Sequence, residues 1–407
     1  MKILYHHRTQ ADDGQAVHIR SLVRAFEGLG HEVREVALVE KTGASDPAGG
    51  SGAGSGALTG TSAPSAAAPR SERSFPWSLV GHVPRFVREL AEYGYTIPAS
   101  RRLRAAVGEF SPDVIYERYA FGNAAGVRVA AATGVPIVLE VNSPMVLELQ
   151  RTRGLAFPRH ARRVETSIFR RATRIAVVTE VLRGMLVDMG IDGSKIFVTP
   201  NGVDPERFEG LDRDAARRDL GIEGVDGVVL GFTGFYRDWH RLDLVVDGLA
   251  DEPALAAAHL VLVGEGPAEE GLRARAAERG VAARVHFAGK RPHHVVPSVL
   301  AAFDVGLVPA INPYASPLKL HEYMAAGVVP VAPDQPNLRE VLVDGVDSVL
   351  VPPGDGVALN RALADLAADD DRRRALGGAA RRAVAERDLT WEGNARRVLD
   401  QVAALRR

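Results

Sequence analysis

Short apolar runs alternate with longer segments of helical periodicity along almost the whole chain. In the first half, the runs include residues 3–5, 114–116, 137–139 and 175–178. Between the first two runs, apolar residues from Ile19 to Leu29 recur at the spacing of a helix. This alternation is typical of βαβ units, whose parallel strands are buried on both faces. It predicts an α/β fold built on a doubly wound parallel sheet.

The same pattern begins again after the sequence PNGVDPERF at residues 200–208. The later apolar runs lie at 228–232, 260–263, 285–287, 305–308, 329–331 and 349–351. A chain of 407 residues also exceeds what one hydrophobic core usually serves. We therefore expect two Rossmann-like domains, residues 1–204 and 205–389. A helical stretch at 390–407 follows, and the sequence leaves open on which domain it packs.

Residues 41–74 interrupt the first domain with a segment rich in Gly, Ser, Ala and Pro. The segment has no apolar periodicity, so it cannot bury enough surface to offset the entropy lost on ordering. It predicts a disordered, low-complexity insertion.

Composition excludes several classes of protein. The formal net charge is −1, which gives no general attraction to nucleic acid. The absence of cysteine excludes disulfides, thiolate metal sites and a cysteine nucleophile, and fits a reducing cytoplasm. No segment reaches the roughly 18 apolar residues of a spanning helix, and the apolar run at the N-terminus is too short for a signal peptide. We expect a cytoplasmic protein without a nucleic-acid partner.

The stretch SPLKLHEYMAAG at 316–327 combines a lysine and a glutamate at an expected strand-to-helix junction. Only five of the 50 Lys and Arg residues are lysines, and Lys319 is one of them. Free N–H groups at a helix N-terminus attract phosphate, and the carboxylate of Glu322 can accept hydrogen bonds from a vicinal diol. The pair thus predicts a site for a diphosphate and a ribose. The other interpretation is an exposed ion pair worth ~0.2–0.5 kcal/mol.

Five motifs together resemble the retaining glycosyltransferases of family 4, which have the GT-B fold. They are SPLKLHEYMAAGVVPVAP, PNGVDPERF, LVLVGEGP, VHFAGKRPHHVVPSVLAAFDVGLVP and GQAVHIRSLVRAFEGLGHEV, and their order also matches. The resemblance covers nearly the whole chain. It implies two Rossmann-like domains that face each other across a cleft, with the donor bound mainly by the second and the acceptor mainly by the first. It also implies a nucleotide-diphosphate sugar as donor and no metal or other cofactor.

The resemblance assigns roles to individual residues. Glu322 matches the family glutamate that holds the donor ribose, and Gly14 matches a glycine whose backbone approaches the diphosphate. Lys319 is expected to pair with the departing diphosphate. The remaining substrate-binding candidates in these motifs are Gln15, Asn201, Gly234, Ser316, Pro317 and Leu318.

The loop GFTGFYRDWHRLD departs from the family pattern. The family usually has an arginine and a lysine here to grip the diphosphate, and this chain has Phe235 and His240 in those positions. We expect Arg237 and His240 to act on the diphosphate, although both could also be solvent-facing loop charges.

Two further departures concern the sugar end of the site. Tyr314 occupies the position of the first of the family's paired glutamates, so the donor sugar is not identified, and Tyr314 becomes a candidate sugar contact. Asn142 replaces a histidine expected near the reacting centre, and Glu140 lies two residues before it. Both are catalytic candidates. The alternative for Glu140 is a solvated carboxylate that merely ends a strand.

Residues 151–174 form a basic segment with eight arginines and a single acidic residue, Glu165. Such a segment can rest on an anionic bilayer, where each basic residue contributes ~1 kcal/mol. A solvated helical face is the alternative interpretation. The membrane interpretation favours a peripheral enzyme with a lipid-linked or other glycan acceptor.

The predicted activity is transfer of a glycosyl residue from a nucleotide-diphosphate sugar with retention of configuration, in cell-envelope, polysaccharide or glycolipid biosynthesis. Two other classes stay open: a GT-B nucleotide-sugar epimerase or isomerase, and a catalytically silent nucleotide-sugar-binding protein.

Overall fold

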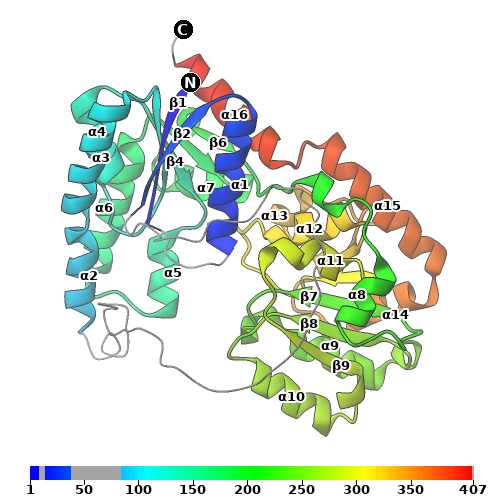
Figure 1. Cartoon of the computed structure of the whole chain (residues 1–407). Helices are drawn as coiled ribbons and strands as arrows, with labels where there is room; N and C mark the ends of the chain where they lie inside the picture. Colours follow the sequence, from blue (N-terminus) through cyan, green and yellow to red (C-terminus); the bar gives the residue numbers. More distant parts are fainter. Residues whose placement is uncertain (9–13, 38–83, 406–407) are drawn as a thin grey trace, which may run out of the picture.

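The computed structural model describes residues 1–8, 14–37 and 84–405. These residues form two parallel sheets of six strands each, in two domains (Figure 1). The predicted α/β architecture with two Rossmann-like domains is confirmed. The insertion expected at 41–74 lies outside the described residues.

The N-terminal sheet has the strand order β2-β1-β3-β4-β5-β6. Its strands are β1 (Lys2–His7), β2 (Glu32–Ala37), β3 (Val114–Arg118), β4 (Ile137–Val141), β5 (Arg174–Val177) and β6 (Ile196–Val198). The helices of this part are α1 (Gly14–Gly28), α2 (Arg85–Gly94), α3 (Thr96–Phe110), α4 (Ala125–Thr133), α5 (Met145–Thr152), α6 (Pro158–Arg171) and α7 (Glu180–Asp188).

The C-terminal sheet has the order β12-β11-β10-β7-β8-β9. Its strands are β7 (Val229–Thr233), β8 (His259–Val263), β9 (Val285–Gly289), β10 (Val305–Leu307), β11 (Val329–Pro333) and β12 (Val349–Val351). The helices are α8 (Arg213–Asp219), α9 (Leu242–Asp251), α10 (Glu269–Glu278), α11 (Val296–Leu300), α12 (Leu318–Ala326), α13 (Pro336–Arg339), α14 (Gly356–Ala368) and α15 (Asp370–Glu386), and α16 (Trp391–Ala404) follows.

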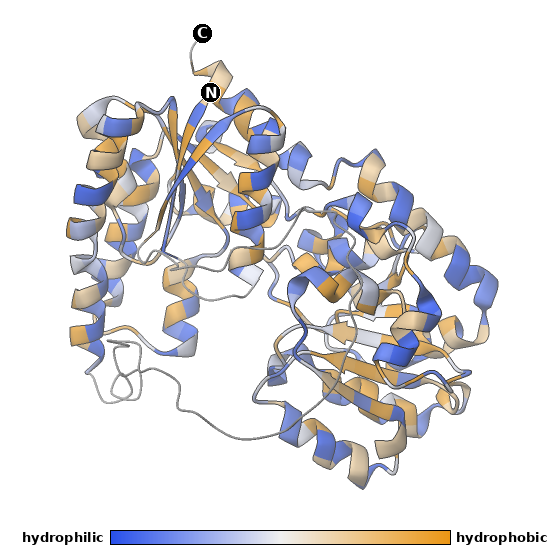
Figure 2. Ribbon diagram, viewed as in Figure 1, coloured by the Kyte–Doolittle hydropathy of each residue, from blue (hydrophilic) through white to orange (hydrophobic). Residues whose placement is uncertain are grey.

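Hydrophobic cores lie on both faces of each sheet, because successive side chains of a strand point to opposite faces. Along β1, Leu4 belongs to one core cluster, and Ile3 and Tyr5 belong to the cluster on the other face. Figure 2 shows hydrophobic residues along the strands and hydrophilic residues on the outer sides of the helices. Burial on both faces explains why the central strands are continuous apolar runs in the sequence.

Two strands were not predicted, and both lie at the edges of the N-terminal sheet. Strand β2 has no fully buried residue, and β6 has only one, Ile196. An edge strand has a neighbour on one side only, so it can keep polar side chains such as those in EVREVA. The apolar signal that marks central strands is therefore weak here.

The chain crosses between the two domains twice, and the two crossings lie side by side. Val203 pairs with Thr390 in a short parallel bridge, and the Val203 N–H donates to the Leu389 carbonyl oxygen at 3.1 Å. After the second crossing, α16 packs on α1 of the N-terminal domain. Its buried residues Ala395 and Val398 share a core cluster with α1.

We predict that Val398→Ala lowers the free energy of unfolding by roughly 2 kcal/mol, because it leaves a cavity between α16 and α1. Denaturant unfolding followed by circular dichroism measures the change. Asp400→Ala, at an exposed position of the same helix, is the matched control and should leave the midpoint unchanged. Equal midpoints for the two variants would contradict a stabilising role of this contact.

Candidate functional site

The N-termini of α1 and α12 meet at the junction of the two domains. A Cβ atom built on Gly14 would lie 3.4 Å from Leu318 Cδ1, which is ordinary van der Waals contact. Pro317 precedes α12, and no side chain caps the first turn of this helix. Gln15 lies exposed in the first turn of α1. Backbone N–H groups at such helix ends attract anions, so this junction suits a phosphate.

Lys319 lies in the first turn of α12, and its ammonium group lies beside the end of β7. Its Nζ lies 3.5 Å from the centroid of the Phe232 ring, close enough for a cation–π contact. A Cβ atom on Gly234 would come within 3.1 Å of Nζ, so a side chain at that position would crowd the amine. Burial lowers the pKa of Lys319 to about 7, although the nearby Glu322 carboxylate raises it in part. The amine is therefore poised to gain a proton when an anion arrives.

His240 lies near Lys319 and is 9% exposed. Burial, with the positive charges of Lys319 and Arg237, lowers the pKa of His240 to about 3. The Arg237 N–H donates to His240 Nδ1 at 3.2 Å, which leaves the proton of the neutral ring on Nε2. The structure thus offers His240 as a neutral hydrogen-bond donor. Arg237 itself is exposed, with its guanidinium 4.9 Å from the Phe235 ring.

Glu322 lies one turn beyond Lys319 and is hydrogen-bonded to His293 instead. His293 Nε2 lies 2.7 Å from Glu322 Oε1. Within the part of the chain that the structure describes, Glu322 Oε2 has no hydrogen-bond partner, so one carboxylate oxygen is available for a ligand. Sequence reasoning missed His293, whose only signal was the histidine pair in RPHHV, shortly after β9.

Glu140, at the end of β4, is 1% exposed and holds together the ends of three strands. Burial alone would raise the pKa of Glu140, but the positive charges of His18 and Arg118 and hydrogen bonds from His18 and Asn142 hold it well below its usual range. Its carboxylate contacts Tyr5 Oη (3.3 Å), Tyr116 Oη (2.9 Å), His18 Nε2 (3.2 Å), Arg118 Nη1 and Asn142 Nδ2.

Five donors occupy this carboxylate, so it is neither a solvated strand end nor an open general base. The geometry fits a positioning role for Glu140. The Asn142 amide is one of these five donors, so its N–H is also committed to the Glu140 carboxylate.

A chain of polar contacts leads from Glu140 to the start of α12. His18, on the buried face of α1, lies between Glu140 and Asn201, with Nδ1 at 2.8 Å from Asn201 Oδ1. The Asn201 N–H donates to Ser316 Oγ at 3.0 Å, and its amide donates to the Ser316 carbonyl oxygen. Asn201 and Ser316, both predicted to bind substrate, are thus bonded to each other. His18 was not predicted, although it stands four residues after Gly14 on the same helix.

Tyr314 extends into the N-terminal domain. Its side chain is 4% exposed and packs in the core cluster of β3 and β4. Its hydroxyl donates to Glu148 Oε1 at 2.7 Å, and its carbonyl oxygen accepts a bond from Thr179 Oγ1 at 2.9 Å. The residue expected at the donor sugar therefore ties the two domains together. Glu148, on α5, was not predicted.

Among residues 1–8, 14–37 and 84–405, no group of three or more His, Asp or Glu side chains has the arrangement of a metal site.

Family models match both domains. The model described as "Glycosyltransferase Family 4" matches residues 13–207, and the model "Glycosyl transferases group 1" matches residues 227–369. A D-inositol 3-phosphate glycosyltransferase of Stackebrandtia nassauensis is 31% identical over 296 residues, 70% of this chain and 66% of that protein. A 2-deoxystreptamine glucosyltransferase of Streptomyces kanamyceticus is 29% identical over 247 residues, 59% of this chain and 63% of that protein. The chain thus spans just under two thirds of the length of these two curated relatives.

Solved structures show the same fold over the full length. Anabaena HepE in complex with UDP-glucose has a TM-score of 0.72 at 17% identity, over 99% of this chain and 100% of that one. Sucrose-phosphate synthase from Thermosynechococcus elongatus has a TM-score of 0.72 at 19% identity, over 100% and 99% of the two chains. With both domains matched by its models and the fold shared throughout, the chain belongs to the family 4, group 1 glycosyltransferases and has their GT-B fold.

Proposed function

We propose that this protein transfers a glycosyl residue from a nucleotide-diphosphate sugar to an acceptor, with retention of anomeric configuration. The observation that carries the proposal is the meeting of the α1 and α12 N-termini beside Lys319, with Glu322 one turn further along α12. Helix ends and an amine suit a diphosphate, and a carboxylate with one open oxygen suits a ribose diol.

Lys319 is the residue best suited to the chemical step. Cleavage of the bond between sugar and diphosphate develops negative charge on the leaving group, and groups fixed in place beforehand stabilise that charge best. Lys319 takes up a proton as this charge arrives, and His240 donates its Nε2 proton as a hydrogen bond. Arg237 can join them by turning from Phe235, because its guanidinium is exposed.

The donor nucleotide proposed here is UDP. The UDP-glucose complex of Anabaena HepE supports this choice of nucleotide, and the fold of the C-terminal domain is shared with it. The identity of the sugar is not part of the proposal, because Tyr314 contacts Glu148 where the family has a sugar-binding glutamate.

We place the acceptor among the glycans or lipid-linked sugars of the cell envelope, with the protein peripheral to an anionic membrane surface on its cytoplasmic side. The basic segment 151–174 supports this placement, because most of its arginines are exposed. A soluble cyclitol is the other acceptor class, since the names of two relatives include inositol 3-phosphate and 2-deoxystreptamine.

Two control reactions separate the transferase from the other classes. An epimerase or isomerase would convert the donor to an isomer in the absence of acceptor. A silent binding protein would bind the donor and release no nucleoside diphosphate with any acceptor. Transfer requires both donor and acceptor, and it releases the diphosphate.

We predict that Glu322→Ala abolishes the rise in melting temperature that UDP gives the wild-type protein. At a UDP concentration of about 100 times the Kd, wild-type stability should rise by roughly 2.7 kcal/mol. Differential scanning fluorimetry measures the shift. Glu270→Ala, an exposed glutamate of the same domain, is the control and should keep it. An unchanged shift in Glu322→Ala would remove Glu322 from the site.

We predict that UDP affinity falls as the pH rises from about 7.5 to 8.5, where the diphosphate of UDP is already fully ionised. The pKa of Lys319 in the free protein is about 7, so the amine is mostly neutral in this range and must take up a proton when the diphosphate binds. Calorimetry in buffers of different ionisation enthalpy measures this uptake. Lys319→Arg stays charged and should lose the uptake, whereas Lys290→Arg, at an exposed lysine, should retain it. Wild-type binding without proton uptake would contradict this role of Lys319.

A further inference from the structure

His293 lies directly beside Glu322, the carboxylate assigned above to the donor ribose. It begins a short 3-10 helical turn, His293–Val295, between β9 and α11. His293 Nε2 lies 2.7 Å from Glu322 Oε1. An ionised carboxylate only accepts hydrogen bonds, so Nε2 carries the proton of this bond. One oxygen of Glu322 is thus committed to His293, and Oε2 is the oxygen open to a ligand.

This hydrogen bond lies where water has little access. The Glu322 side chain is 11% exposed, and the His293 side chain is 30% exposed. A hydrogen bond to an ionised group is roughly twice as strong as one between neutral groups, and little solvent screens it here. A glutamate side chain has several rotatable bonds and would otherwise sample many orientations. His293 therefore holds the carboxylate of Glu322 in one orientation.

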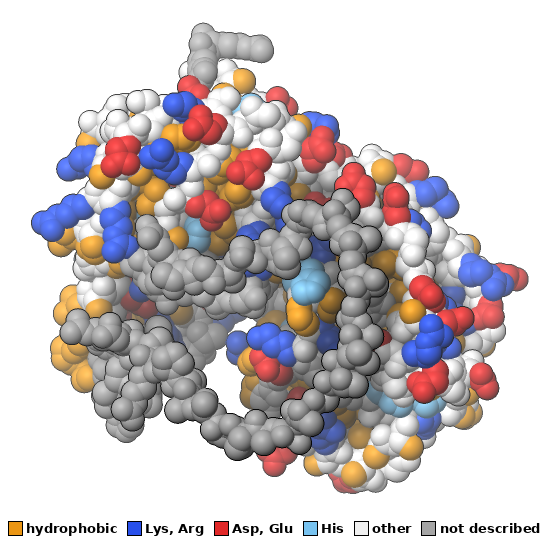
Figure 3. All heavy atoms as spheres, viewed as in Figure 1, with side chains coloured by type: hydrophobic (Ala, Val, Ile, Leu, Met, Phe, Trp, Pro, Cys, Tyr) orange, Lys and Arg blue, Asp and Glu red, His pale blue; other side chains and the backbone are white. Residues whose placement is uncertain are grey.

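The turn that carries His293 is fixed to the segment that follows the first crossing between the domains. Arg207, in that segment, donates from Nη2 to the carbonyl oxygen of His293 at 3.1 Å. Figure 3 shows acidic and basic side chains interspersed on the visible face of the C-terminal domain. A pair of this kind lies just before the turn, where Lys290 Nζ is 3.2 Å from Glu265 Oε1. An exposed pair contributes little, so Arg207 is the stronger anchor. His293 thus has a fixed backbone from which it orients Glu322.

We propose that His293 is a positioning residue that makes the donor site selective for a ribonucleotide. The inference rests on the proposed function, because it takes Glu322 as the residue that holds the donor ribose. His293 keeps Oε1 occupied and the carboxylate oriented, so that a ribose hydroxyl donates to Oε2 without prior rearrangement of the side chain. His293 acts on the nucleotide through Glu322.

Selectivity follows from the cost of an unpaired carboxylate oxygen. A nucleotide that lacks the ribose hydroxyls would cover Oε2 of Glu322 without giving it a hydrogen bond, and a desolvated, unpaired charged group is costly. Sites built to bind a hydroxyl reject analogues without it for this reason. Without His293, Glu322 could rotate its carboxylate towards water when the hydroxyl is missing. The penalty would then fall, and the selectivity would fall with it.

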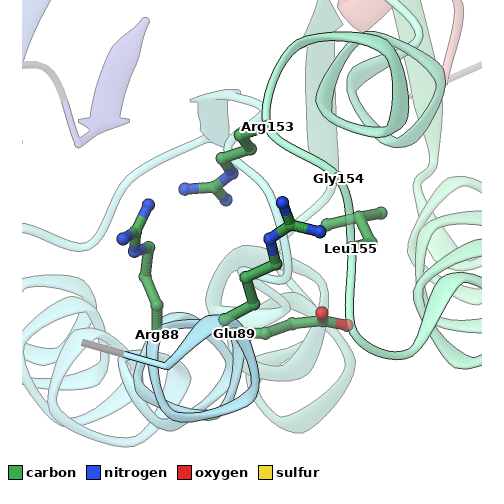
Figure 4. A pocket seen from close by; sticks show the side chains of 6 residues that line it. Arg88, Glu89, Arg153, Gly154 and Leu155 are labelled. Carbon is green, nitrogen blue, oxygen red and sulfur yellow. The ribbon is translucent and has the colours of Figure 1, made fainter. Parts of the chain in front are cut away.

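Two pockets away from the junction suit a nucleotide less well. The pocket beside α2, lined by Arg153 and Leu155 among others (Figure 4), encloses about 10 Å³, which is room for one water molecule at most. A hollow of about 500 Å³ lies beside the start of β7. Its arginines are engaged in ion pairs, such as that of Arg213 Nη2 with Asp304 Oδ1 at 2.7 Å. We therefore expect nucleotide titrations to report one site, at the junction of α1 and α12.

Calorimetric titration of the full chain with two nucleotides tests the proposal. The probes are UDP and 2′,3′-dideoxyuridine diphosphate, which lacks both ribose hydroxyls. We expect the wild-type chain to bind UDP more tightly by a factor on the order of 100, as for a hydrogen bond to an ionised group. His293→Ala should weaken UDP binding about tenfold and leave the dideoxy nucleotide within about twofold of wild type, so the ratio falls to about ten.

Matched variants separate the contact with Glu322 from general damage. His293→Leu fills similar space but cannot donate a hydrogen bond, so it should lose selectivity as His293→Ala does. The amide of His293→Gln can still donate to Glu322 Oε1, so this variant should keep the selectivity within about threefold of wild type. His294→Ala changes the exposed neighbour of His293 and should leave both affinities unchanged. Melting temperatures without ligand check that each variant is folded.

Equal weakening of both nucleotides in His293→Ala and His293→Leu would overturn the proposal, because it would indicate a purely structural role. Unchanged UDP affinity in these variants would overturn it as well. Neither result bears on the proposed transfer, which UDP binding by the wild-type chain and release of UDP with an acceptor test without any change at position 293. A wild-type chain that fails to bind UDP would contradict the proposed function itself.

Discussion

The double crossing between the domains is the constraint on which the site depends. The segments around Val203 and Thr390 are hydrogen-bonded to each other, so both connections lie in one place. Gly202 makes this possible, because a Cβ there would lie only 2.6 Å from the backbone of Thr390. Two adjacent connections restrict domain motion to a hinge about this pair. The N-termini of α1 and α12 are therefore held opposite each other at this junction.

A buried polar network connects the two halves of the site through this hinge region. It runs from Glu140 through His18 and Asn201 to Ser316, directly before α12. A buried network in which each member is bonded fixes one arrangement, because breaking any contact leaves a polar group unpaired in a low-dielectric environment. The strand ends of the N-terminal domain thus help to position the helix that carries Lys319.

Local patterns made the fold predictable from the sequence, and they also led to the proposed nucleotide end of the site. Central strands bury both faces and appear as apolar runs, and the α12 motif keeps Lys319 and Glu322 on neighbouring turns. The remaining features depend on contacts between distant segments. Tyr314 meets Glu148 across 166 positions of the chain, and Glu322 meets His293 rather than its neighbour Lys319. Such pairs leave no periodic pattern within one segment of the sequence. The edge strands β2 and β6 were also not predicted, because they bury few side chains and lack the apolar run of a central strand.

The choice of lysine at position 319, in a chain that mostly uses arginine, follows from the burial of this amine. Arginine keeps its charge, so an arginine in this place would bear the desolvation cost whenever the site is empty. A lysine whose pKa is about 7 can lose its proton in the free protein and avoid that cost. A bound diphosphate, as proposed above, would favour the charged form, and the more negative leaving group of the transition state would favour it further. The same burial that lowers the pKa of Lys319 would strengthen the proposed interaction with the departing diphosphate, because little water would screen the pair.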